Sequence, residues 1–140
     1  SQRIWVMSSP SGYDKHYTVE TPRRDARISV GIDTTAGTVD RFLVQLHYTR
    51  SVRPRRSTAI SRIDHNPASQ FGHDLYAEGL HVDVVLPDGS EAKLWPPHSP
   101  PPSDEGSLIT ACIEYFRSNV DYFVRVSEGI EQPGEPPRWP

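Results

Sequence analysis

Residues 62 to 83 hold the densest group of side chains able to move protons, bind a metal or hold a phosphate. The group comprises three of the six histidines, two aspartates and an arginine: Arg62, Asp64, His65, His73, His81 and Asp83. Two histidines that titrate near neutral pH can act as a general base and a general acid, and an arginine beside them can bind a phosphate and stabilise developing negative charge. This combination predicts metal-independent ribonuclease chemistry. His65 and His81 would be the proton-transfer pair, with Arg62 at the phosphate. Asp64 or Asp83 would orient a histidine.

The same residues allow three other interpretations. In the first, His65, His73, His81 and Asp83 offer three nitrogens and one oxygen, a set that suits zinc, although the spacings match no compact metal motif. In the second, the histidines make hydrogen bonds to a partner. In the third, the residues are structural: Arg62 and the aspartate two positions later form an ion pair, and the last histidine and aspartate form a solvated strand face. We expect neither a metal nor another cofactor.

A second basic group lies just upstream, in the loop between two predicted strands. It consists of Arg50, Arg53, Arg55 and Arg56. Such a loop can hold the phosphates of RNA without reading sequence, or it can dock an acidic protein. It can also be a solvated loop in which Pro54 and the charges discourage strand pairing. The net charge of −3 argues against the whole chain being a basic surface for nucleic acid.

Composition limits the class of protein. The 140 residues are enough for one domain, and 35% hydrophobic content gives it a modest core. No segment approaches the roughly 18 to 20 apolar residues that span a bilayer, so no membrane partner is expected. The single cysteine, Cys112, cannot form an internal disulfide, which fits a reducing, cytoplasmic compartment. Glycine-rich phosphate loops, Gly-x-Ser-x-Gly elbows and paired cysteines are missing from the sequence, which argues against those enzyme and zinc-finger classes.

Alternation of apolar and polar residues predicts the strands that must position the reactive groups. Five are expected, over residues 26–32, 41–49, 57–65, 80–86 and 91–95. On the fourth, His81 and Asp83 share the polar face. On the third, Arg62 and Asp64 share one face and His65 the other, unless the strand bulges. One residue of register therefore decides whether Arg62 or His65 lies beside His81.

One long helix is predicted after the proline-rich connector 96–102, with Ser103 as N-cap and Gly129 at its end. Its apolar residues recur at helical spacing and form a stripe wide enough to lie on a sheet. Cys112 lies on that stripe and is expected in the core. The prediction is an α+β fold, an antiparallel meander of about five strands covered by one long C-terminal helix. Residues 1–25 are expected to be irregular, 26–129 to form a single domain, and 130–140 a loose proline-rich tail.

Residues 40 to 126 resemble a group of small bacterial and archaeal proteins (TumE-like), on Arg62-Ile63-Asp64-His65, the later His73 and His81-Val82-Asp83, and the terminal helix. Some of them are described as toxin-like partners of helix-turn-helix antitoxins. The resemblance implies an RNA-acting toxin with a cognate antitoxin. The expected function is therefore a toxin-type ribonuclease of a toxin–antitoxin pair. The alternative is a non-catalytic protein-interaction module that uses the sheet edge, the arginine loop or the tail.

Overall fold

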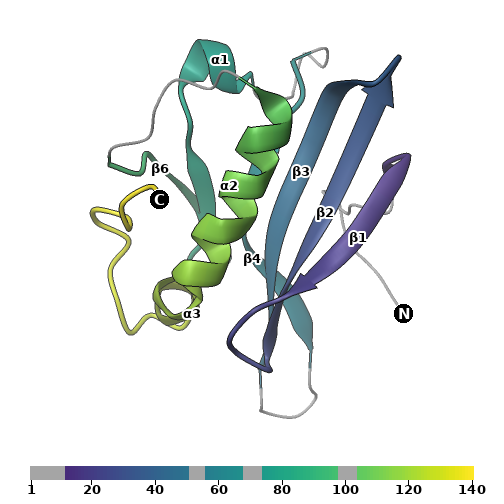
Figure 1. The fold of residues 1–140 in the computed structure, drawn as a ribbon. Helices are drawn as coiled ribbons and strands as arrows, with labels where there is room; N and C mark the ends of the chain where they lie inside the picture. Colours follow the sequence, from purple (N-terminus) through teal and green to yellow (C-terminus); the bar gives the residue numbers. More distant parts are fainter. Residues whose placement is uncertain (1–11, 51–55, 68–73, 98–103) are drawn as a thin grey trace.

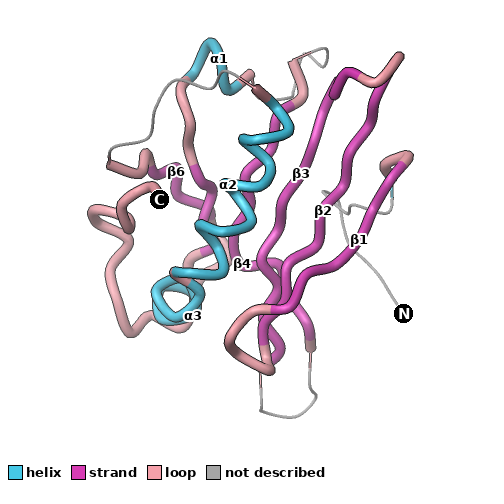
Figure 2. The backbone as a smooth tube through the Cα atoms, in the orientation of Figure 1, coloured by secondary structure: helices cyan, strands magenta, loops and turns pink. Residues whose placement is uncertain are grey.

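The computed structural model describes residues 12–50, 56–67, 74–97 and 104–140. Six strands form one sheet in which neighbours along the chain are neighbours in space and all pairs are antiparallel (Figures 1 and 2). The elements are β1 (Lys15–Glu20), β2 (Ala26–Thr35), β3 (Thr38–Thr49), β4 (Ser57–His65), α1 (Leu75–Glu78), β5 (Val82–Val85), β6 (Glu91–Leu94), α2 (Glu105–Ser118) and α3 (Val120–Ser127). The predicted α+β class and antiparallel meander are confirmed. Five strands and one long helix are corrected to six strands and two C-terminal helices.

The additional strand, β1, lies inside the segment expected to be irregular. It pairs with β2 over six consecutive residues without a bulge, with Thr18 opposite Ser29. Main-chain and side-chain contacts fix the chain just before it. The Asp14 N–H donates to Asp33 Oδ1 at 2.7 Å, and the Arg41 guanidinium stacks 4.0 Å from the centre of the Tyr13 ring. β1 is therefore a well-anchored edge strand.

The predicted single helix is interrupted at Asn119. This residue adopts φ −124° and ψ 22°, outside the helical region, and its side-chain N–H donates to the Tyr115 carbonyl at 2.9 Å. Asparagine suits such a position because its side chain competes for backbone hydrogen bonds. The break turns Phe123 of α3 edge-on to Phe116 of α2, with ring centres 5.3 Å apart. At the other end of α2 the N-cap is Asp104, whose carboxylate accepts from the Ser107 N–H; the predicted cap, Ser103, lies outside the described residues.

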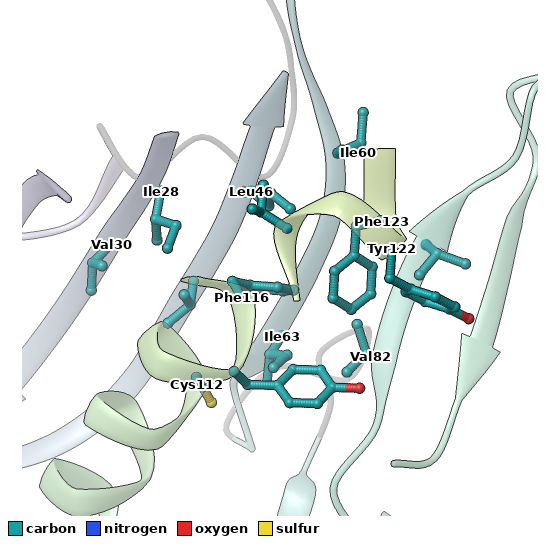
Figure 3. Packing of buried hydrophobic residues seen from close by; sticks show 14 of the residues in the cluster. Ile28, Val30, Leu46, Ile60, Ile63, Val82, Cys112, Phe116, Tyr122 and Phe123 are labelled. Atoms are coloured by element: carbon teal, nitrogen blue, oxygen red, sulfur yellow. The ribbon is translucent and has the colours of Figure 1, made fainter. Parts of the chain in front are cut away.

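The core lies between one face of the sheet and the two C-terminal helices. Alternate residues of β2 to β5 point to this helix-facing side, and Figure 3 shows part of the cluster: Ile28, Val30, Leu46, Ile60, Ile63, Val82, Cys112, Phe116, Tyr122 and Phe123. The sulfur of Cys112 is enclosed, as expected, and burial raises the pKa of its thiol. The opposite, helix-free side of the sheet carries polar strand residues that include Ser29, Gln45 and Arg62. No helix in the described part of the chain is long and apolar enough to cross a membrane.

The turn between β2 and β3 consists of two residues with positive φ, Ala36 at 52° and Gly37 at 82°. Positive φ at both central positions is the mark of a type I′ turn, whose twist matches that of the flanking strands. Glycine adopts this conformation without strain, whereas alanine does so at a cost. The strands therefore extend further into the expected loop 33–37 than alternation alone predicts.

The C-terminal tail packs against the helices, although the sequence led us to expect a loose segment. The Trp139 side chain is only 5% exposed, and its ring centre lies 4.9 Å from that of Tyr115. The Trp139 N–H donates to the Pro97 carbonyl at 2.9 Å, and the Tyr115 hydroxyl donates to the Pro137 carbonyl at 2.8 Å. Residues 130–140 thus contribute a large aromatic side chain to the core despite their polar, proline-rich composition.

Candidate functional site

Arg62 of β4 lies opposite Asp83 of β5 on the helix-free side of the sheet. Its Nε lies 3.4 Å from an Asp83 carboxylate oxygen, and its Nη2 lies 3.0 Å from Glu91 Oε1 on β6. The predicted ion pair with Asp64 is replaced by these cross-strand pairs. A guanidinium held by two carboxylates is already neutralised, so this arrangement favours a structural role for Arg62 over phosphate binding.

His81 comes directly before β5 and is 2% exposed. Its Nδ1 lies 3.0 Å from the Gly79 carbonyl oxygen, which assigns the Nδ1 proton to that hydrogen bond. The imidazole ring centre lies 5.9 Å from that of Trp95. Since Val82 points into the core, strand alternation places His81 on the same side as Asp83, as the sequence predicted.

His65, the last residue of β4, lies on the helix-facing side, opposite Phe42 of β3. It is 3% exposed, its ring centre lies 5.7 Å from that of Phe42, and its Nδ1 accepts the Leu75 N–H at 3.1 Å. Burial lowers its pKa, which keeps the ring neutral, while nearby acidic groups including Asp74 act in the opposite direction. The expectation that His65 faces away from Arg62 and Asp64 is confirmed. The two candidate proton-transfer histidines therefore lie on opposite sides of the sheet.

Of the predicted phosphate-binding arginines, Arg50 and Arg56 are described and exposed, with the Arg50 N–H 3.3 Å from the Arg56 carbonyl. Arg53 and Arg55 lie outside the described residues, as does His73. Among the residues that the structure does describe, no three histidine, cysteine or acidic side chains are grouped closely enough to hold a metal.

Sequence reasoning missed a histidine–serine pair on the helix-free side of β2 and β3. Ser29 Oγ lies 2.6 Å from His47 Nε2, and both residues are buried. Burial lowers the pKa of His47 to about 4, with a smaller contribution from Arg27. An imidazole that resists protonation is a poor acceptor of the serine proton, so the pair is not an activated nucleophile. Alternation along residues 41–49 is enough to place His47 on this polar face, whereas its pairing with Ser29 depends on the β2–β3 register.

The two edges of the sheet differ in how well they are protected. β6 has four residues, carries Lys93 within it, and is followed by Pro96 and Pro97. Short length, lysine and proline are the usual devices that block pairing at a sheet edge. β1 is longer, has neither a proline nor a bulge, and exposes Tyr17, which is 40% accessible. Within the described residues β1 pairs with β2 alone, so its other side presents main-chain N–H and C=O groups.

The model of a protein family, a domain of unknown function (DUF7718), matches residues 12–128. The chain belongs to the DUF7718 family. The family span begins before β1 and ends just after α3, so in this DUF7718 domain the edge strand lies within the matched residues and the tail with Trp139 lies beyond them. No curated protein and no solved structure matched the chain.

Proposed function

We propose that this DUF7718 domain is a non-catalytic protein-binding module that accepts an extended polypeptide on the β1 edge of its sheet. The observation that carries the proposal is the edge itself: six residues, regular pairing on one side, no proline and no bulge, with its one lysine, Lys15, at the first position of the strand. An extended segment that adds to such an edge gains main-chain hydrogen bonds, while side-chain contacts on the two faces provide selectivity.

The candidate catalytic residues support this choice because their interactions lie within the fold. His65 and His81 are each held by a main-chain group, and Arg62 is held by two carboxylates. A general acid–base pair must reach the same substrate atoms, which two buried rings on opposite sides of a sheet do not do. Ribonuclease activity remains a prediction from the sequence. The predicted cognate antitoxin, itself a protein, is one partner that this proposal accommodates.

Edge binding can be tested with a displayed library of random peptides, followed by calorimetric titration of the selected sequences. Alternate residues of an edge strand direct their N–H groups toward β2 and away from it. Of Thr18→Pro and Val19→Pro, one removes an outward N–H and the other removes a bond to β2. The proposal predicts one variant that stays folded but no longer binds, and one that loses stability.

Hydrogen exchange locates the bound peptide. We expect selected peptides to protect β1 amides on binding, with a Kd of roughly 10 μM or tighter. A library that yields no binder, or binders that protect another region and ignore both proline variants, would overturn the proposed function.

A further inference from the structure

We infer that the strand accepted at the β1 edge is the β1 strand of a second copy of this chain, so that two sheets join into one continuous sheet. The inference rests on the proposed function and names its partner. It follows from the residues of β1, Lys-His-Tyr-Thr-Val-Glu, and from the face of the sheet on which each lies.

The two faces of β1 have different characters. Tyr17 and Val19 lie opposite Val30 and Ile28 of β2, which places them on the helix-facing side. His16, Thr18 and Glu20 alternate with them and lie on the helix-free side. Every residue of β1 except Val19 is exposed, so all of these side chains are available to a neighbouring strand.

Geometry restricts how β1 can pair with itself. In an antiparallel pair, directly opposite residues must both point their main-chain groups into the interface or both point them away. Two identical strands satisfy this only when one residue lies directly opposite its own copy, with the twofold axis midway between the two copies. The axis can therefore lie at Tyr17 or at Thr18, but not between these two positions.

Charge and side-chain character favour the axis at Thr18. This register places His16 opposite Glu20 of the partner copy, Tyr17 opposite Val19, and Thr18 opposite Thr18. By symmetry the first two pairs each occur twice in the dimer. Imidazole with carboxylate, aromatic with β-branched, and threonine with threonine are all favourable cross-strand pairs. The axis at Tyr17 instead places Asp14 opposite Glu20, two like charges. The edge is thus self-complementary in one register.

The interface is accessible in the arrangement of the fold. α2 packs on β2 and β3, and α3 packs on β4 and β5. Figures 1 and 2 show β1 at the far edge of the sheet from β6 and the C-terminus. A second sheet can therefore extend the first without displacing either C-terminal helix.

Sedimentation of the full chain from micromolar to hundreds of micromolar concentrations tests the dimer. We expect a monomer–dimer equilibrium in the wild type. Thr18→Lys sets two like charges against each other across the axis and should raise the dimer Kd about fivefold or more. Thr38→Lys, an equal charge change at an exposed strand position away from β1, should leave the Kd unchanged.

Disulfide formation between copies tests the register. Opposed side chains at the axis have Cβ atoms about 5 Å apart, so Thr18→Cys should form a covalent dimer rapidly in a glutathione buffer. Thiols introduced by His16→Cys would be separated by roughly 13 Å along the strands and should react far more slowly. The native Cys112 is buried in the core and does not compete.

A chain that stays monomeric at every concentration overturns the inference, as does a dimer that Thr18→Lys leaves intact. Equal reaction rates for Thr18→Cys and His16→Cys overturn the register. If the chain is monomeric but library peptides still protect β1, the inference fails while the proposed function stands. If neither peptides nor a second copy bind at β1, both fail.

Discussion

Acidification should destabilise the fold through His47, the imidazole buried beside Ser29. Burial lowers the pKa of His47 to about 4 in the folded chain, whereas an unfolded histidine titrates near pH 6.5. Between these values the unfolded chain binds a proton that the folded chain does not. Stability is therefore fully present above about pH 6.5 and falls as the pH falls toward 4.

The size of the effect follows from the two pKa values. Relative to high pH, the preferential protonation of His47 in the unfolded chain lowers the free energy of unfolding by about 0.2 kcal/mol at pH 7 and by about 2 kcal/mol at pH 5. Once the pH is below 4, the decrease is just over ~3 kcal/mol. The pKa of His65 is also lowered by burial, so this residue adds a loss of the same sign. A loss of about 2 kcal/mol is a large part of the stability of a domain this size.

Urea unfolding at pH 7 and pH 5 measures the loss. Between pH 7 and pH 5 we expect the free energy of unfolding of wild type to fall by at least about 2 kcal/mol. For His47→Gln we expect this decrease to be smaller than in wild type by about 2 kcal/mol. Comparing the two pH values within one variant cancels the cost of altering the bond to Ser29. At a protein concentration low enough to keep the chain monomeric, His16→Gln, which replaces an exposed histidine on the same side of the sheet, should behave as wild type. The reasoning is refuted if His47→Gln loses as much stability as wild type, or if NMR titrates His47 near pH 6.5.

Variants in the turn, the tail and the histidine segment test three other features of the structure. Ala36→Asn should raise the free energy of unfolding by about 0.5 to 1 kcal/mol in urea titrations, because asparagine tolerates positive φ better than alanine; a loss of stability would contradict the type I′ assignment. Trp139→Ala should lower the free energy of unfolding by about 3 kcal/mol, whereas Ile130→Ala, whose side chain is 71% exposed, should lower it by less than about 0.5 kcal/mol; equal effects would mean that the tail does not dock. RNA incubated with wild type or His81→Ala should remain intact in both cases, and cleavage by wild type alone would restore the ribonuclease prediction.

The interior strands could be predicted from sequence because each has one apolar and one polar face. β3 is the clearest case, since Phe42, Val44 and Leu46 all point into the core. β1 escaped prediction because its alternation is short: only Tyr17 and Val19 are apolar, and both faces of this edge strand remain largely exposed. The break at Asn119 was also invisible to periodicity, because the apolar spacing continues across it into α3. The tail was misjudged because one tryptophan carries most of its packing.

The candidate site was predictable in its faces but not in its contacts. Alternation correctly separated His65 from Arg62 and placed His81 with Asp83. What alternation lacks is the register between β4 and β5, which puts Arg62 opposite Asp83 rather than beside a histidine. It also gives no information on burial, which here encloses both rings and removes them from solvent.

Because Cys112 is enclosed in the core, the reaction of its thiol with a reagent reports on unfolding of the chain. It is the single thiol in the sequence, it lies in the middle of the helix–sheet core, and burial raises its pKa. A thiol reagent therefore reacts with it when the helices separate from the sheet, and the labelling rate in native buffer measures how often that opening occurs. Opening free energies can thus be measured under native conditions, without denaturant and without an introduced cysteine.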